Sequence, residues 1–408
     1  SGTMTLQARA TRDLTAFNLD FDGFDISSLL VDGAPAQYDR NDAELSITPP
    51  TPLANGQEFT VAVAYSGNPS GRDGEGSIFE RGWTRYEDGV FVASEPAGAH
   101  AWYPVNDHPC DKATYTIIMT VQKPWVVAAN GLLKATEDRG DRTTYRWEAS
   151  DLTASYLVTV QIADFVREEQ RGPNGLPIRN YYPRGEGGDN PGEVFNRTPE
   201  MIEFFNSVFG PYPFEAYGVA VADVDLFFAL ETQTMSLFVR NFLGGGGGGF
   251  EGEATVAHEL SHQWFGNSVS LERWKDIWLN EGFATYSQWL WDEHNSGASA
   301  LQDQVRGAYR ALEAAEPPPP GDPPQSDLFN MGVYIRGALV LQALRVEVGD
   351  DAFFRILKTY AERFKYSNAS TEEFIAVAEE QSGKQLDALF DAWLYDPDLP
   401  PAAQVGLR

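Results

Sequence analysis

The stretch VAHELSHQW, residues 256–264, places two histidines on either side of a glutamate and predicts a metal-binding helix. A helix turns by about 100° per residue, so His258 and His262 would lie on one face, one turn apart. That spacing lets two imidazoles bind one ion, and Glu259 beside them can reach a water held by that ion. The pattern is short enough to arise by chance, so by itself it indicates a zinc site without proving one.

A third ligand is required, because a catalytic zinc has three protein ligands and one open position. It is expected to be a His, Asp or Glu on another element. Glu281 supplies it, with eighteen residues between it and His262. The aromatic run after Glu281, FATYSQWLW, predicts a second buried helix. A carboxylate at the start of such a helix is costly to bury unless it is paired or metal-bound, which favours a zinc site over ordinary core or surface histidines.

The composition predicts a multidomain globular chain. With 408 residues, 42% of them hydrophobic, and ten tryptophans, the chain can bury more than one core. The net charge of −29 disfavours nucleic acid and anionic membranes as partners, and it serves either solubility or the attraction of cationic ligands. A single cysteine, Cys110, excludes an internal disulfide framework and suits a cytoplasmic location. No apolar run reaches the roughly 18 to 20 residues of a membrane helix, and no signal peptide is visible.

The first 165 or so residues show the period-two alternation of half-buried antiparallel strands. The clearest examples are FNLDF at residues 17–21, EFTVAVAY at 58–65 and SYLVTVQI at 155–162. The second of them follows an Asn55-Gly56 turn signal. This part of the chain therefore predicts a domain of packed β-sheets.

From about Asn180 the hydrophobic period becomes helical, with one strand-like stretch, YGVAVADVDLFFALE, at residues 217–231. The expected helices include 198–209, which begins with a Thr-Pro start signal, 338–348, 351–364 and 370–381. The last of these opens with Ser370 and Glu373 at the spacing of a capping box. The second half is therefore expected to be mainly helical.

Two segments interrupt the helical pattern. PPPPGDPP, residues 317–324, cannot be helical and predicts a stiff loop. The six glycines from Gly244 to Gly249 predict a mobile segment that ends shortly before His258. This segment is either a tolerated surface linker or a substrate-responsive loop beside the site.

VAHELSHQWFGN followed by DIWLNEGFATY resembles the zinc aminopeptidases of the aminopeptidase-N and leukotriene-hydrolase family. Their highly specific pattern is H-E-x-x-H, eighteen residues, then E within W-L-N-E-G-F-A. The resemblance covers nearly the whole chain. It implies an N-terminal antiparallel β-sandwich or saddle domain over residues 1–166, then a thermolysin-like, mainly α-helical catalytic domain with a small sheet over residues 167–408.

The same resemblance implies one zinc ion per chain, with His258, His262 and Glu281 as its ligands and Glu259 as the general base. In this chemistry the zinc polarises the scissile carbonyl and lowers the pKa of its water, and the glutamate passes the proton to the leaving amine. The family stabilises the charge that grows on the carbonyl oxygen with the tyrosine of V-Y-E-K-G. GVYIRGAL is similar and assigns this role to Tyr334, which spacing alone leaves as an ordinary core aromatic.

An aminopeptidase must also recognise a free ammonium group, and buried carboxylates are its natural partners. In the family one carboxylate comes from G-x-M-E-N. The similar stretch here is FALET, which implies Glu231 as the ammonium ligand and Ala229 and Leu230 as neighbouring substrate contacts. Phe228, Leu230 and Thr232 replace the family's Gly, Met and Asn, and the bulk of Phe228 is expected to narrow the site.

A second family carboxylate lies in Q-x-E-P within the β-domain. VASEPAGAHAWYP is similar and implies Glu95, although Ala93 stands where the family has glutamine. Composition and spacing alone leave both glutamates as solvated surface charges. With the resemblance they become a clamp that holds the first peptide bond over the zinc, in a site between the two domains. His100 and His108 do not fit the zinc set and are interpreted as structural.

Both ends of the chain differ from many relatives. The first strand, in SGTMTLQARA, is similar to one some way into the family's β-domain, so earlier strands are expected to be lost or present as a separate fragment of the protein. Larger members carry a long helical domain after the equivalent of Asp396–Pro401, and the resemblance implies a compact form without it.

The leading hypothesis is a monomeric zinc aminopeptidase acting on peptides with a free N-terminus. A neutral zinc endopeptidase shares the metal set, and lipid-epoxide hydrolysis occurs in one branch of the family on a similar site. A zinc-bound but inactive peptide-binding module is the third alternative, although all the catalytic residue types are present.

Overall fold

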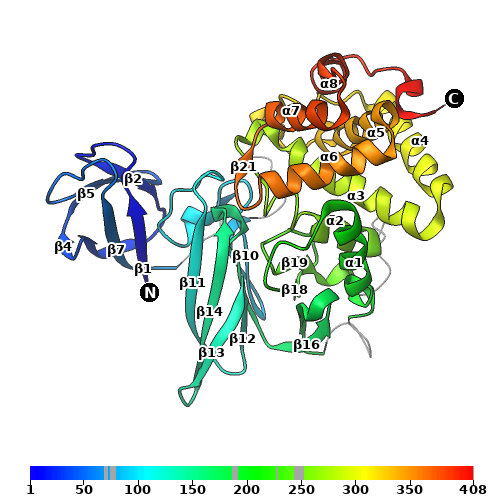
Figure 1. The fold of residues 1–408 in the computed structure, drawn as a ribbon. Coiled ribbons are helices and arrows are strands. Elements are labelled where there is room, and N and C mark those ends of the chain that lie inside the picture. The colour runs from blue at the N-terminus through cyan, green and yellow to red at the C-terminus, as the bar shows by residue number, and fades with distance from the viewer. Residues whose placement is uncertain (69–71, 74–79, 186–191, 227, 243–251, 408) are drawn as a thin grey trace.

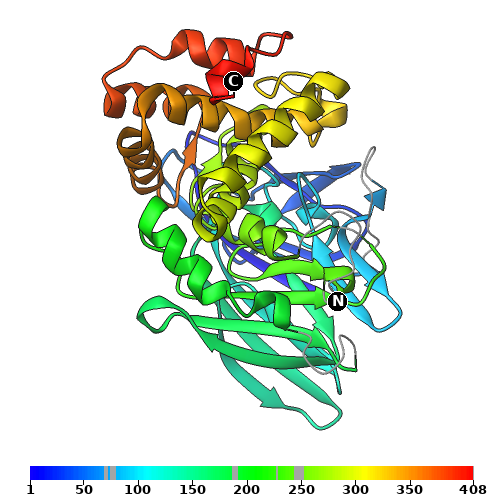
Figure 2. The ribbon, with the colours of Figure 1, turned by 90° about the vertical axis from the view of Figure 1, so that its right-hand side faces the viewer.

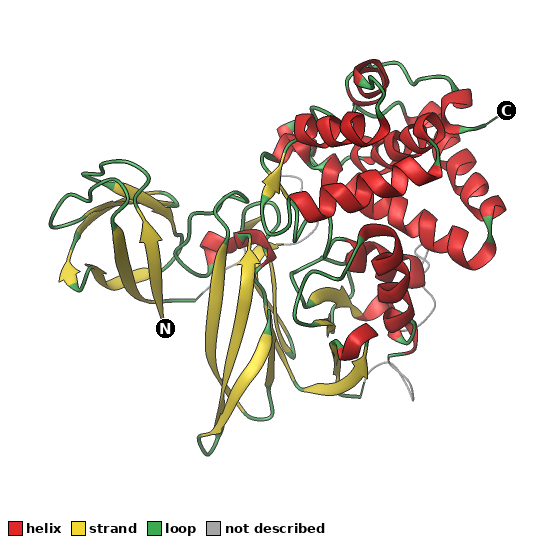
Figure 3. Ribbon diagram, viewed as in Figure 1, coloured by secondary structure: helices red, strands yellow, loops and turns green. Residues whose placement is uncertain are grey.

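The computed structural model describes residues 1–408 except 69–71, 74–79, 186–191, 227, 243–251 and 408. The predicted run from Gly244 to Gly249 lies outside the described residues. The N-terminal part is built from antiparallel sheets and the C-terminal part is mainly helical, which confirms the predicted fold class (Figure 1 and Figure 3). In Figure 1 the chain runs from small sheets through long strands to the helices.

The N-terminal part of the chain forms a small sandwich of two sheets, with strand orders β1-β7-β3-β4 and β2-β6-β5. The strands are β1 (Gly2–Arg9), β2 (Phe17–Asp20), β3 (Asp25–Val31), β4 (Ala34–Pro35), β5 (Gln37–Asn41), β6 (Glu44–Thr48) and β7 (Glu58–Ser66). Along β7, Phe59, Val61 and Val63 are buried and the intervening residues are not, as the alternation predicts. These side chains join a core closed by Phe21 and Ile47.

The next part of the chain forms a larger sandwich, whose sheets have the strand orders β12-β15-β10-β9-β8 and β11-β14-β13. The strands are β8 (Arg72–Asp73), β9 (Glu80–Tyr86), β10 (Gly89–Ala93), β11 (Ala113–Gln122), β12 (Val126–Ala129), β13 (Leu132–Asp138), β14 (Arg142–Thr153) and β15 (Val160–Ala163). Strand β10 is buried on both faces. Val90 and Val92 lie in the sandwich core, whereas Phe91 and Ala93 pack against the second half of the chain. β10 therefore joins the two halves.

The stretch SYLVTVQI departs from its prediction. Only its last part is a strand, because Ser155–Leu157 forms a 3-10 turn and β15 begins at Val160. The side chain of Asn130 fixes this shape by accepting from the Thr159 N–H and donating to the Leu157 carbonyl. Residues 155–162 are all buried, so the alternation of polar and apolar residues in SYLVTVQI does not correspond to a strand with one solvated face.

The second half contains a four-stranded sheet rather than one strand. The order β16-β17-β18-β19 comprises β16 (Phe165–Arg171), β17 (Pro177–Pro183), β18 (Tyr217–Ala222) and β19 (Ser236–Val239). The predicted 217–231 stretch is a strand only over β18. The parallel strands β18 and β19 are buried throughout, and strands buried on both faces carry no alternation to reveal them.

The helices cover this sheet and pack on one another (Figure 2). They are α1 (Thr198–Phe209), α2 (Gly252–Ser261), α3 (Trp278–Ser296), α4 (Ala298–Ala315), α5 (Gly337–Val348), α6 (Asp350–Arg363), α7 (Thr371–Ser382) and α8 (Asp387–Leu394). The capping box of Ser370 and Glu373 at the start of α7 is confirmed. A two-stranded sheet of β20 (Ser270–Leu271) and β21 (Asn368–Ala369) ties α2 to the later helices.

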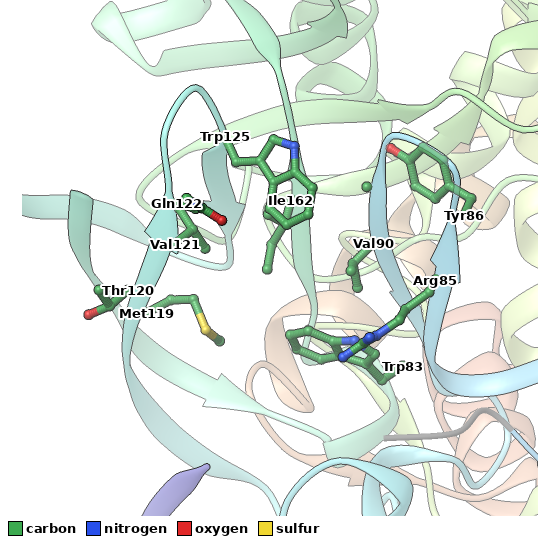
Figure 4. A pocket seen from close by; sticks show the side chains of 11 residues that line it. Trp83, Arg85, Tyr86, Val90, Met119, Thr120, Val121, Gln122, Trp125 and Ile162 are labelled. Atoms are coloured by element: carbon green, nitrogen blue, oxygen red, sulfur yellow. The ribbon is translucent and has the colours of Figure 1, made fainter. Parts of the chain in front are cut away.

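A cavity of about 420 Å³ opens in the larger sandwich, away from these helices. Figure 4 shows Trp83 and Val90 on one side of it and Met119 and Trp125 on the other. None of the residues that line it belongs to the predicted site. No helix in the described part of the chain is long and apolar enough to cross a membrane.

Candidate metal centre

Helices α2 and α3 bring the three predicted zinc ligands together. Nε2 of His258 lies 3.2 Å and Nε2 of His262 lies 3.6 Å from Oε2 of Glu281. His262 follows the last assigned residue of α2, but its N–H still donates to the His258 carbonyl, so the helical turn carries both rings to one face. A ligand atom from each of the three residues lies within 4.8 Å of the other two.

The second nitrogen of each imidazole is already engaged. Nδ1 of His258 lies 3.0 Å from Oε1 of Gln288, and Nδ1 of His262 lies 3.1 Å from the Phe265 carbonyl. Both acceptors require a proton on Nδ1, which leaves both Nε2 lone pairs facing Glu281. Two imidazoles and one carboxylate, so oriented, fit a zinc ion. Sequence reasoning missed Gln288, although it lies seven residues after Glu281 and therefore on the same face of α3.

Three further carboxylates join this cluster. Glu231 and Glu259 form one close group with His262, and Glu95 and Glu231 form another with Glu281, each with ligand atoms within 4.8 Å. Glu231 and Glu259 are 2% and 5% exposed. One oxygen of each, Oε1 of Glu231 and Oε2 of Glu259, has no hydrogen-bond partner among the residues that the structure describes. Buried polar atoms are normally paired, so these oxygens mark a site built for a ligand.

The electrostatics of the cluster are set by burial first. Burial raises the pKa of Glu259 well above its usual range, and burial together with Glu281 raises the pKa of Glu231. Burial also acts on Glu281, but in the metal-free site the charge of protonated His262 and the hydrogen bonds that the imidazoles then donate outweigh burial and hold the pKa of Glu281 at about 2. A divalent cation in the centre would favour the ionised form of every carboxylate.

Tyr334 reaches the cluster from a π-helical turn, Gly332–Arg336, that leads into α5. Its ring stacks on the ring of His258, with centroids 6.3 Å apart and an interplanar angle of 20°. Burial raises the pKa of Tyr334 well above its usual value, and the nearby Glu281 and Glu95 add to this effect. The hydroxyl therefore keeps its proton and remains a donor.

Glu231 is held by its backbone. Its carbonyl accepts from Nε2 of Gln263 at 3.0 Å and from Nδ2 of Asn267 at 2.6 Å. The preceding Leu230 exchanges two backbone hydrogen bonds with Leu237 of β19. Gln263 and Asn267 follow the zinc helix directly, so they fix Glu231 relative to the zinc ligands. Neither residue was predicted from the sequence as part of the site.

The other predicted substrate contacts lie beside Glu231. Ala229 is partly buried, whereas the Leu230 side chain is buried in a cluster with Phe91 and Leu237. Phe228 packs on Phe91, with ring centroids 5.8 Å apart, so it lies against β10.

Glu95 lies two residues beyond the end of β10 and is partly buried. The double-sided burial of β10 therefore carries a β-domain carboxylate to the zinc ligands. His100 lies outside the cluster, where Nδ1 pairs with Oδ2 of Asp107 at 2.8 Å.

Comparison with known proteins places the chain in a family. The peptidase family M1 domain matches residues 193–393, and the peptidase M1 N-terminal domain matches residues 1–157. The chain belongs to peptidase family M1. The M1 domain match contains His258, His262 and Glu281, and zinc is the cofactor of this family's metallopeptidases.

Solved M1 structures share the fold over almost all of the chain. The M1 zinc metallopeptidase from Deinococcus radiodurans is 29% identical, with a TM-score of 0.89, and the match covers 98% of this chain and 90% of that chain. A mutant of the Deinococcus protein bound to a Tyr-Ser-Ala substrate is 30% identical with the same TM-score and coverage.

Curated M1 relatives are longer. Aminopeptidase M1-B of Oryza sativa subsp. japonica is 28% identical over 323 residues, which are 75% of this chain and 37% of that protein. Glutamyl aminopeptidase of Homo sapiens is 27% identical over 355 residues, which are 78% of this chain and 35% of that protein. The chain thus spans well under half the length of these relatives.

Proposed function

We propose that this M1 family member is a zinc aminopeptidase that hydrolyses the first peptide bond of peptides with a free N-terminus. The observation that carries the proposal is that carboxylates able to bind an ammonium lie beside a zinc ligand. One carboxylate oxygen from each of Glu95, Glu231 and Glu281 lies within 4.8 Å of the other two. A metal site so close to an ammonium site suits cleavage at the chain terminus.

In this proposal each side chain has one task. Glu95 and Glu231 accept hydrogen bonds from the substrate ammonium and so position the first peptide bond. His258, His262 and Glu281 would hold zinc, which when bound would supply Lewis-acid polarisation of the scissile carbonyl and acidify a water. Glu259 is the general base, which accepts a proton from water and gives it to the leaving amine.

Tyr334 completes the set, because its protonated hydroxyl donates to the carbonyl oxygen as negative charge grows there. Ala229 and Leu230 would border the first residue of the substrate, with Ala229 the more accessible of the two.

The relatives support this assignment. The curated relatives from Oryza sativa and Homo sapiens carry the name aminopeptidase. Related two-domain M1 zinc metallopeptidase mutants hold L-tryptophan and L-arginine, and the Deinococcus mutant holds Tyr-Ser-Ala. An endopeptidase has no need for two carboxylates beside the zinc ligands, so it is not favoured, and cleavage of free-amine substrates without epoxide turnover would exclude a lipid-epoxide hydrolase. The monomeric state and the domain boundary between residues 166 and 167, which falls within β16, remain predictions.

Two variants test the proposal. Glu259→Gln is expected to lower kcat about 10²- to 10⁴-fold with one zinc per chain retained, because only the base is lost. Glu231→Gln is expected to raise KM for an aminoacyl amide about tenfold or more, because the ammonium loses a charged acceptor. Steady-state kinetics and metal analysis check both. Unchanged turnover in Glu259→Gln would reject the assigned base, and an unchanged KM in Glu231→Gln would reject the clamp.

A further inference from the structure

Lys112 of the β-domain reaches into the catalytic half of the molecule. It lies one residue before β11, and its Nζ lies 3.0 Å from each of three backbone carbonyls, those of Asn267, Ser268 and Ser367. A lysine ammonium has three N–H donors, so all three are used. The adjacent residues dock on the same surface, since Asn368 donates to the Pro109 carbonyl and Cys110 to the Glu272 carbonyl.

Two of these three carbonyls, those of Asn267 and Ser268, belong to the loop that follows the zinc helix, and the third, that of Ser367, directly precedes β21. This loop joins His262 to β20, and the N–H of Asn267 donates to the His262 carbonyl at 3.0 Å. The Asn267 side chain donates to the Glu231 carbonyl at 2.6 Å. A continuous line of hydrogen bonds therefore runs from the Lys112 ammonium through Asn267 to Glu231.

These hydrogen bonds act by fixing the position of Glu231 rather than by changing its charge. Asn267 and Glu231 are 0% and 2% exposed, so solvent cannot replace these contacts. Oδ1 of Asn267 has no partner within the described part of the chain, and the Asn267 amide is therefore oriented through its donor alone. The backbone position of Asn267 then decides whether that donor reaches Glu231. Ser270 of the catalytic half also donates to the Asn267 carbonyl, at 3.2 Å, so among the hydrogen bonds of the described residues Lys112 alone links this carbonyl to the β-domain.

We propose that Lys112 is a positioning residue for substrate binding: by holding Asn267 it sets where the Glu231 carboxylate meets the ammonium of the substrate. The inference rests on the proposed aminopeptidase function. The β-domain then contributes to ammonium binding twice, directly through Glu95 and indirectly through Lys112. Binding of the free amine therefore depends on the contact between the β-domain and the catalytic half.

The test compares two ligands that differ only at the amine. Binding of L-tryptophan and of N-acetyl-L-tryptophan to the zinc-loaded enzyme is measured by calorimetry for the wild type and for Lys112→Met. Loss of the ammonium of Lys112 is expected to weaken L-tryptophan binding about five- to twenty-fold, to leave the acetylated ligand within about twofold, and to leave one zinc per chain. Lys134→Met, on the exposed part of β13, is the matched control and is expected to change neither affinity.

A residue that merely stabilised the fold would weaken both ligands together or neither. Equal affinities for L-tryptophan in the wild type and a folded, zinc-loaded Lys112→Met would overturn the inference, as would equal losses for both ligands. Failure of the wild type to prefer the free amine would instead reject the proposed function itself.

Lys112→Gln has a shorter side chain with only two N–H donors, so it cannot make all three contacts and serves as the test variant if Lys112→Met does not fold. The same selective loss of L-tryptophan affinity is expected of it.

Either Lys112 variant, combined with Asn267→Ala, gives a double-mutant cycle. Because Lys112 is inferred to act through Asn267, the loss of L-tryptophan affinity in the double variant is expected to be no greater than in Asn267→Ala alone. Additive losses would show that Lys112 acts by another route and would contradict the inference.

Discussion

At the scale of single residues, the orientation of the two imidazole ligands depends on one side chain and one backbone carbonyl outside the ligand set. Gln288 accepts from Nδ1 of His258, and the Phe265 carbonyl accepts from Nδ1 of His262. Each contact fixes a tautomer and a ring orientation, which a zinc ligand needs before the ion arrives. Gln288 is neutral, so it orients His258 without adding another negative charge to a cluster that already holds four glutamates.

Replacing Gln288 by leucine is therefore expected to weaken zinc binding about 10- to 100-fold, because His258 loses its orienting acceptor. Zinc affinity measured by competition with a chromophoric chelator checks this. Gln288→Glu keeps an acceptor and is expected to bind zinc at least as tightly as the wild type. The control is Gln304→Leu on α4, where the wild-type side chain contacts only Asp292 among the hydrogen bonds described. Equal zinc affinities for Gln288→Leu and this control would contradict the account.

The sequence predicted the metal ligands better than the carboxylates around them. His258, His262 and Glu281 follow from helical spacing and from the cost of burying a carboxylate, both of which are local properties. Glu95 and Glu231 come together only through the docking of β10 against the catalytic half, so no local pattern distinguishes them from surface charges. They were identified only through the family resemblance.

At the scale of elements, helices α3 and α5 pack with their backbones in direct contact beside the site. Gly282 follows Glu281 on α3, and a Cβ at that position would lie 2.8 Å from Cα of Gly337, the first residue of α5. This close approach brings the Tyr334 turn against the start of α3. The two glycines therefore position Glu281 relative to Tyr334.

Gly282→Ala is expected to lower stability by about 1–3 kcal/mol, because the added methyl must push α3 and α5 apart. It is also expected to weaken zinc binding, since Glu281 moves with the helix. Thermal unfolding and chelator competition check the two effects. Gly307→Ala on α4 is the matched control: its Cβ meets nothing within 4 Å, so the better helix propensity of alanine should raise Tm. A Gly282→Ala protein as stable as Gly307→Ala would argue against this packing.

The bounds of amphipathic helices were predictable, whereas those of doubly buried strands were not. Helix α1 has the predicted bounds, and α7 differs from its predicted range of 370–381 by one residue at each end, because each helix has one solvated face. Strands β18 and β19 have no solvated face, and β15 was overestimated for the same reason. Burial on both sides removes the periodic signal while keeping the structure.

At the scale of the whole molecule, the surface between the two halves contains a pair of carboxylates. Asp151 on β14 is hydrogen-bonded to Glu215, which precedes β18 in the catalytic half. Burial and the charge of Glu215 raise the pKa of Asp151 to about 6, whereas an unfolded aspartate titrates near 3.8. The folded state therefore binds a proton that the unfolded state releases. Its contribution to stability is complete below about pH 4 and is lost as the pH rises through 6.

Asp151→Asn is expected to remove this pH dependence. Because the pair is partly exposed, the free energy of unfolding of Asp151→Asn is expected to increase by only about 1 kcal/mol at pH 8. Its Tm should therefore rise by about 2 °C at pH 8 and change little at pH 4. Thermal unfolding of both proteins at the two pH values checks it. Asp138→Asn is a surface control, because Lys123 lowers the pKa of Asp138 and its loss should not raise Tm at pH 8. An Asp151→Asn effect of the same size at both pH values would contradict the assigned cause.

The zinc ligands and the two glutamates proposed to bind the substrate ammonium, Glu95 and Glu231, are proposed to form one active site. The most direct test is the ratio of kcat/KM for leucyl-aminomethylcoumarin and its N-acetyl derivative, measured on the zinc-loaded wild type. We expect a preference of about 10³-fold or more for the free amine, since a blocked amine cannot pair with the carboxylates of Glu95 and Glu231. Equal cleavage of the two substrates would contradict the clamp and with it the assignment as an aminopeptidase.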